Sequence, residues 1–205
     1  MRAAIGLVLL AACDPLAGTG YVGEPIFTLS GTFDVKSSTQ DPGAGIALMW
    51  QDAAGANGPG VAATVVPVTV EVPASFRVSV PVLPPDASRF DLGDGAIAEA
   101  YVFLVADPSA TPLVPRGVDR RHALVWTASD IADGTPTAAY LGGATTAGYH
   151  LRHFSSQPVP PPQQQALLSR CVTGGADPAA CQARRAYALG TIADDDPLVI
   201  VVTGP

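Results

Sequence analysis

Apolar and polar side chains alternate along Phe27-Thr28-Leu29-Ser30-Gly31-Thr32-Phe33-Asp34-Val35-Lys36. In an extended chain the phenylalanines, the leucine and the valine fall on one side, and the threonines, the serine, the aspartate and the lysine fall on the other. This period of two is typical of a β-strand with one buried face. Gly31, in the middle, favours a bulge or the close approach of another backbone. The run therefore predicts a half-buried strand and a core built on a sheet.

Similar runs follow at the close spacing expected of an all-β domain. We expect strands over residues 46–51, 66–72, 76–82, 97–105, 122–127, 149–154 and 198–202. Pro67 and Pro81 cannot donate to a ladder, so their strands have at least one unpaired edge. The run 97–105 is long and apolar, which suits the centre of a sheet. The run 198–202 is apolar on both faces, which predicts burial between two layers.

Helical signals come late in the chain. Pro158–Pro162 favours an extended polyproline conformation, and a helix is expected over 163–170. Asp177-Pro178 supplies an N-cap and a first helical residue for a second short helix over 179–188. About eight strands with one helical insertion, about 163–188, predict an all-β fold, namely a β-sandwich with an immunoglobulin-like or transthyretin-like layout.

Two cysteines flank the middle of this insertion. Cys171 and Cys181 form an even pair once Cys13 is set aside, and an exported chain would join them in a disulfide. Such a bridge would tie the two short helices together and contribute roughly 3 kcal/mol of stability. A metal site at these cysteines is the alternative, but it needs further ligands, and the segment between them holds no histidine.

The beginning of the chain carries Arg2, an apolar segment over 3–12, and then Leu10-Ala11-Ala12-Cys13. As a helix the apolar segment covers only about 15 Å, whereas a hydrocarbon core measures about 30 Å. Leu10 stands where an ordinary signal peptidase site carries a small residue. The order instead resembles a bacterial lipoprotein signal peptide with its lipobox, which implies a diacylglycerol on Cys13. The alternative is a buried N-terminal helix with an incidental cysteine.

This resemblance sets the expected organisation of the chain. Residues 1–12 would be a signal peptide, 13–24 a tether and 25–205 a single domain. The diacylglycerol on Cys13 would supply two acyl chains, which hold a protein stably on a membrane. Because the signal peptide directs export, the expected location is the cell envelope, at the periplasmic or extracellular face. Asp14 resembles the residue that keeps some lipoproteins at the inner membrane. The net charge of −7 disfavours nucleic acid and anionic lipids as partners, while a protein or glycan partner stays open.

No catalytic or ligand-binding motif emerges from the polar residues. His150 and His153 are three apart in an expected strand, so they point to opposite faces and cannot share an ion, and His122 stands alone. No Gly-x-Ser-x-Gly elbow occurs, and neither Gly142-Gly143 nor Gly174-Gly175 is followed by the lysine of a phosphate loop. We therefore expect no catalytic residue, no metal and no cofactor.

Several aspartates and both tryptophans have two possible roles. Asp91, Asp94 and the run Asp194–Asp196 favour solvated loops, with a weak calcium site as the alternative. Trp50 and Trp126 fall within expected strands, so core packing is their expected use rather than ligand binding.

Four elements together resemble uncharacterised bacterial envelope lipoproteins: the strand 27–36, Arg121-His122-Ala123-Leu124-Val125-Trp126, Gly148-Tyr149-His150-Leu151 and the cysteine-bearing tail. The resemblance implies an envelope location and an all-β domain, and it carries over no substrate. We expect a lipid-anchored, non-enzymatic binding or structural module. An envelope hydrolase is one alternative, which a cleft joining His122 or His150 to a carboxylate and a hydroxyl would favour. A surface adhesin or inhibitor is another, which a contiguous exposed apolar patch would favour.

Overall fold

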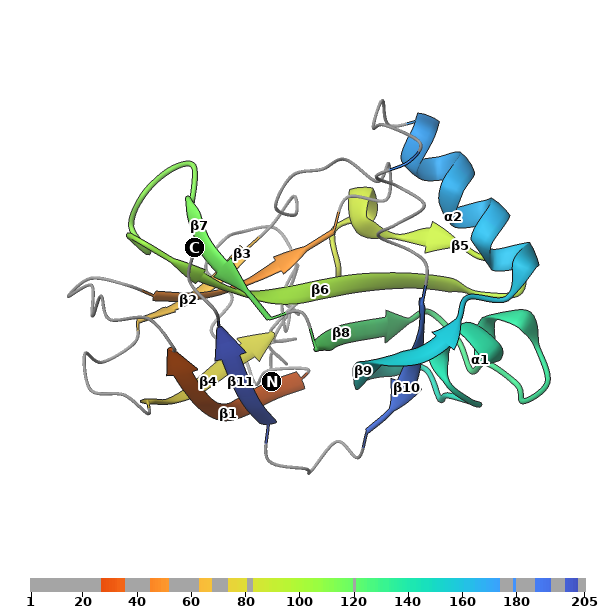
Figure 1. The fold of residues 1–205 in the computed structure, drawn as a ribbon, viewed down its shortest axis with the longest axis horizontal. Helices are drawn as coiled ribbons and strands as arrows, with labels where there is room; N and C mark the ends of the chain where they lie inside the picture. Colours follow the sequence, from red (N-terminus) through yellow and green to blue (C-terminus); the bar gives the residue numbers. More distant parts are fainter. Residues whose placement is uncertain are drawn as a thin grey trace, which may run out of the picture.

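The computed structural model describes residues 27–35, 45–51, 63–67, 74–80, 83–119, 121–173, 179, 187–192 and 198–202. The fold is all-β, as the sequence predicts, and has two sheets with a few short helices at one end (Figure 1). The strands are β1 (Phe27–Val35), β2 (Gly45–Trp50), β3 (Ala63–Pro67), β4 (Ala74–Val80), β5 (Phe90–Asp91), β6 (Ala96–Val105), β7 (Pro115–Val118), β8 (His122–Thr127), β9 (Gly148–Pro158), β10 (Tyr187–Thr191) and β11 (Leu198–Val202). The helices are the 3-10 turn η1 (Asp86–Ser88), α1 (Pro136–Leu141) and α2 (Pro161–Thr173).

The small sheet has the order β11-β1-β4. Its central strand β1 runs antiparallel to β4 and parallel to β11. Leu29 is buried, while Thr28, Ser30 and Thr32 are exposed, so the alternation along β1 has the predicted consequence. The prediction for β11 is wrong, because this strand forms an edge of the sheet and the Val199 side chain is 53% exposed. β-Branched residues suit any pleated strand, so an apolar run alone does not place a strand between two layers.

The large sheet has the order β10-β9-β8-β6-β2-β3, with β5 and β7 also paired to β6. The long strand β6 crosses the middle of the molecule in Figure 1, which confirms the prediction of a central strand. β3 is an edge strand, as Pro67 predicts. It shares only Val66 and Pro67 with the expected strand 66–72, whose other residues lie outside the described part of the chain.

Each face of the large sheet buries its own apolar cluster. The face toward the small sheet contributes Leu48, Trp50 and Trp126, which pack with Leu29 and Val78 of that sheet. Both tryptophans are thus core residues, as predicted. The opposite face packs against α1 and α2 through a cluster that includes Ile97, Val125, Tyr140, Leu141 and Leu167.

The helices differ from the prediction in three ways. α1 was not expected; the Thr135 side chain accepts a hydrogen bond from the Ala138 N–H at its start, and Gly142 ends it with φ +85°. α2 begins at Pro161, inside the expected polyproline segment, because proline is tolerated in the first turn of a helix. Tyr187 and Ala188 lie in β10, which pairs with β9, so the helical insertion ends before residue 188. Among the described helices, none is both long and apolar enough to cross a membrane.

Candidate functional site

A bulge interrupts the strand that lies beside β6. β7 and β8 pair with the same side of β6, one after the other. Phe103 lies opposite Val118, and Ala100 lies opposite Leu124. The chain from Val118 to Leu124 is therefore longer than the stretch of β6 beside it, which runs from Ala100 to Phe103. The surplus bulges out between Val118 and Leu124. Bulges of this kind often re-aim side chains next to functional sites.

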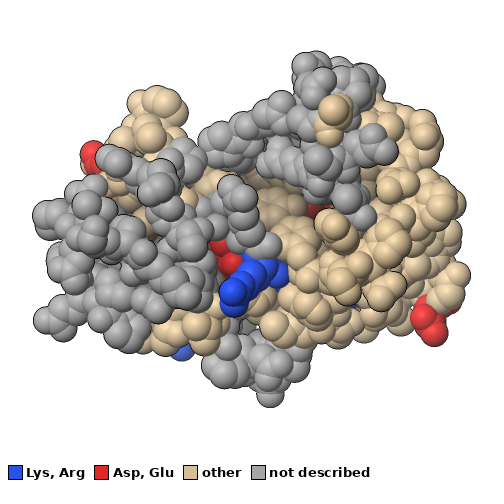
Figure 2. Space-filling view, viewed as in Figure 1, with Lys and Arg blue, Asp and Glu red and all other residues tan. Residues whose placement is uncertain are grey.

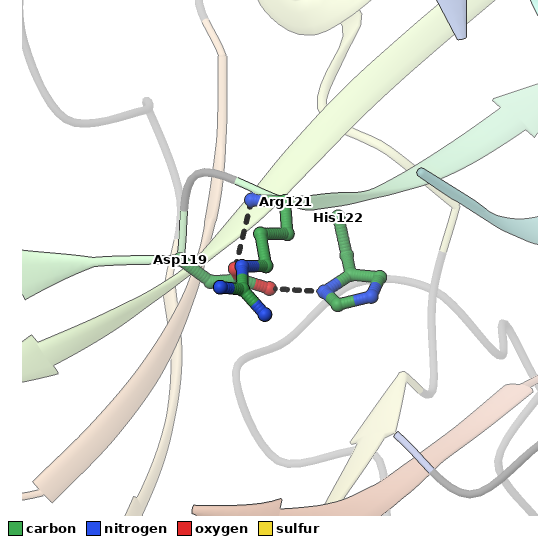
Figure 3. Close-up of polar contacts among 3 residues, drawn as sticks. All are labelled: Asp119, Arg121 and His122. Carbon is green, nitrogen blue, oxygen red and sulfur yellow. Dashed lines mark hydrogen bonds and ion pairs between the residues drawn. The ribbon is translucent and has the colours of Figure 1, made fainter. Parts of the chain in front are cut away.

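Asp119 is fixed at this bulge by hydrogen bonds on both sides. Its N–H donates to the Val102 carbonyl of β6 at 2.8 Å, and its side chain is 1% exposed. One carboxylate oxygen, Oδ1, accepts the Arg121 N–H at 2.9 Å, which forms the local turn that aspartate favours. The other oxygen, Oδ2, lies 2.7 Å from Nδ1 of His122 (Figure 3).

This geometry selects one tautomer of His122. An ionised carboxylate is only an acceptor, so with Asp119 ionised the proton of the pair lies on Nδ1. The other ring nitrogen, Nε2, then presents a lone pair, and no described residue makes a hydrogen bond to it. The His122 side chain is 15% exposed. A carboxylate orients histidine in this way in general bases and in metal ligands.

Arg121 adds a positive charge to the same place. Its residue is exposed, and its carbonyl accepts the Phe154 N–H of β9 at 2.8 Å, so the backbone is fixed while the side chain is free to extend. Figure 3 shows that the contact of Arg121 with Asp119 is made by its backbone N–H, and the Arg121 side chain makes no ion pair with a described carboxylate. Described charges are few on the face in Figure 2, where a basic and an acidic group lie side by side near the middle.

The other two histidines lie on β9 and point to opposite faces, as the sequence predicts. His150 lies opposite Val125, on the side of the helices, and its Nε2 is 2.8 Å from the Thr146 carbonyl oxygen. His153 lies directly opposite His122, on the side of the small sheet. The sequence did not predict this pairing, because it depends on the register between β8 and β9.

The acidic residues near η1 have structural roles. Asp91 accepts the Gly93 N–H at 2.7 Å. Asp94 accepts the Thr137 N–H at 3.1 Å and is also hydrogen-bonded to the Thr137 hydroxyl, so it caps the start of α1. Burial raises the pKa of Asp94, but the hydrogen bonds from Thr137 outweigh it and leave the pKa below the ordinary value. Across the described residues, no group of three or more His, Cys, Asp or Glu is placed to hold a metal.

A buried polar group that sequence reasoning missed lies on the helix side of β6. The Glu99 side chain, in a residue only 1% exposed, accepts the Tyr101 hydroxyl at 2.8 Å and is also hydrogen-bonded to the Tyr140 hydroxyl of α1. One signal was available: Glu99 is the single charged residue within the apolar run 97–105. Buried carboxylates need such partners, so this charge in a central strand indicated a polar site.

Some predicted residues lie outside the described part of the chain: Cys13, Cys181, Asp194–Asp196 and the side chain of Cys171, whose backbone lies in α2. Large exposed apolar side chains in the described part are those of Leu83, Val114, Tyr187 and Val199, which belong to four separate segments. Comparison with protein-family models, curated proteins and solved structures finds no match. The chemistry of the site is therefore argued from its own geometry.

Proposed function

We propose that the chain is a lipid-anchored protein of the bacterial cell envelope and that its domain is a binding module. The lipobox Leu10-Ala11-Ala12-Cys13 supports the anchor. The domain would be a β-sandwich of immunoglobulin-like or transthyretin-like layout, and the core shared between the two sheets supports this assignment. Cys171 lies in the last turns of α2, from where a disulfide to Cys181 would tie the insertion. Thiol alkylation with and without reductant, read as a mass change, tests that bridge.

The observation that carries the binding role is the cluster of Asp119, Arg121 and His122. Next to Asp119 lie the exposed residue Arg121 and the oriented imidazole of His122, in a chain with net charge −7. The imidazole is held in one orientation before any ligand binds, which lowers the entropy cost of holding a polar ligand. The ligand class that fits a guanidinium and an imidazole is an anionic or hydrogen-bonding group on a protein or glycan.

The anchor is tested by expressing the full chain with Cys13→Ala beside the wild type. The wild-type protein should gain the mass of a lipid and fractionate with membranes, whereas the variant should lose both properties. If the wild type carries no lipid and the variant still fractionates with membranes, the anchor proposal is wrong.

A hydrolase is the second candidate, and the 2.7 Å contact between His122 Nδ1 and Asp119 favours it. With Nε2 presenting a lone pair, His122 would act as a general base that activates a water molecule. A panel of soluble esters and amides would be offered to the wild type, His122→Gln and the control His150→Gln. Hydrolysis lost only in His122→Gln supports this function, and equal rates in all three proteins exclude it.

A further inference from the structure

One histidine of β8 and one histidine of β9 face the same side of the large sheet, toward the small sheet. His122 lies opposite His153, and the next pair along the strands, Arg121 and Phe154, is joined by the bond from the Phe154 N–H to the Arg121 carbonyl. Hydrogen-bonded and non-hydrogen-bonded pairs alternate in an antiparallel ladder. His122 and His153 are therefore a non-hydrogen-bonded pair, in which the Cα atoms are only about 4.5 Å apart and the side chains lie closest.

We propose that His122 and His153 form a binding site for a divalent transition-metal ion such as Zn²⁺ or Cu²⁺. Imidazole nitrogens suit these ions. The proposal goes beyond the proposed function, because it requires neither the lipid anchor nor a hydrolytic reaction.

Asp119 positions the first ligand. A histidine that binds a metal almost always donates its other ring N–H to a carboxylate or a carbonyl, which fixes the tautomer and the ring orientation. The bond between Asp119 Oδ2 and His122 Nδ1 is this arrangement, and it leaves Nε2 for the metal. Asp119 is itself held by the Arg121 N–H and by its place in the β6 ladder, so the ring is preorganised before any ion arrives.

The His153 ring has to turn from β10 toward β8 before it can act as the second ligand. The His153 ring lies against Gly190 of β10, where an added Cβ would fall 2.5 Å from the ring atom Cε1. His153 has no hydrogen-bond partner among the described residues. The absence of a side chain at Gly190 explains why the ring lies over β10. Rotation about the side-chain bonds of His153 would turn the ring toward His122, on the strand at the other side of β9. Metal binding would select the second position.

Two protein ligands leave coordination positions for water or for donor atoms of a ligand. The site is therefore weaker than a structural zinc site, which has four protein ligands. The positive charge of Arg121, an exposed residue next to His122 in the sequence, favours an anionic donor, such as a carboxylate, in the open positions.

The test uses the full chain with its thiols blocked by N-ethylmaleimide, so that cysteine cannot bind the ion. ZnCl₂ is titrated by calorimetry into the wild type, His122→Gln, His153→Gln and Asp119→Asn. His150→Gln is the matched control, because His150 lies on the same strand as His153 but on the opposite face, and the chain has only three histidines. Electron paramagnetic resonance with CuCl₂ counts the bound nitrogens.

We expect one Zn²⁺ per chain, two nitrogen ligands on Cu²⁺ and unchanged binding in His150→Gln. His122→Gln and His153→Gln should each weaken binding at least about tenfold, and Asp119→Asn by about tenfold through loss of the ring orientation. Zn²⁺ should raise the melting temperature of the wild type and of His150→Gln, but not of His153→Gln. The proposal is wrong if no saturable binding occurs, if His150→Gln weakens binding as much as the others, or if His153→Gln binds like the wild type.

Discussion

The Tyr140 hydroxyl on α1 is hydrogen-bonded to the Glu99 carboxylate on β6, so a helix that the sequence did not predict is joined to the central strand of the large sheet through a buried charge. The Tyr101 hydroxyl, 2.8 Å from the same carboxylate, is the second phenol that binds it. Tyr140 is 2% exposed, whereas Tyr101 is only partly buried. The two bonds should therefore differ in their contribution to stability.

Tyr140→Phe should lower the free energy of unfolding by about 2 kcal/mol, because it removes a hydrogen bond to a buried carboxylate that water cannot replace. Tyr101→Phe should cost clearly less, because the Tyr101 side chain is only partly buried. Urea denaturation of the two variants measures the difference. Equal losses would mean that burial does not set the strength of these bonds.

Asp119→Ala should destabilise the domain by about 1–3 kcal/mol, because it leaves the Arg121 N–H and His122 Nδ1 without their buried acceptor. Asp107 is the matched control, since its carboxylate accepts the Ser109 N–H in the same local turn but is fully exposed. Asp107→Ala should have a much smaller effect in the same chemical denaturation. A comparable loss in both variants would show that the turn, rather than the burial of Asp119, carries the stability.

Gly142→Ala should destabilise the domain more than Gly134→Ala. Both glycines have positive φ, +85° and +75°, so both substitutions carry the cost of a left-handed residue, about 1 kcal/mol. A Cβ on Gly142 would also fall 2.7 Å from the Leu189 carbonyl oxygen, whereas a Cβ on Gly134 meets nothing within 4 Å. Thermal unfolding of the two variants isolates the contact with β10. Similar melting temperatures would contradict the close approach of α1 to that strand.

Asp94 should make stability depend on pH under acidic conditions. Its pKa is lowered in the folded state, so its contribution is present above the ordinary pKa of 3.8 and is lost as the pH falls through the lower, folded value. Asp94→Asn, which keeps an acceptor for Thr137 but cannot titrate, should show a shallower fall of unfolding free energy below pH 3.8. Identical pH profiles would remove Asp94 from the acid response.

Local patterning predicted the parts of the fold whose faces differ in polarity. The alternation in β1 and the long apolar run of β6 were sufficient to predict these strands, because the faces that are buried carry apolar residues. The prediction for β11 was wrong because all of its residues are apolar, so the sequence does not indicate which face of the strand is covered. β10 and α1 are short, so local preference contributes little to their stability. β10 is stabilised mainly by its pairing with β9, and α1 by its packing on β10.

The candidate site was the least predictable part. Asp119 and His122 are close in the sequence, but they meet only because β7 and β8 share one side of β6 with residues to spare. His122 and His153 lie opposite each other only through the register of β8 and β9. Neither relationship leaves a periodic signal. Val118-Asp119 followed by two arginines does carry the polar interruption of a turn between two strands, and this was the one clue available.

The contact of Gly142 with the backbone of Leu189 and Gly190 also bears on how the protein behaves at high concentration. β10 is the last strand of the large sheet, and the outer strand of a sheet is where foreign chains add and aggregates begin. The Thr191 hydroxyl donates to the Gly142 carbonyl at 3.1 Å, which holds the end of α1 against this strand. The end of α1 thus covers part of the edge strand β10. A substitution that loosens this contact should increase self-association before the domain unfolds.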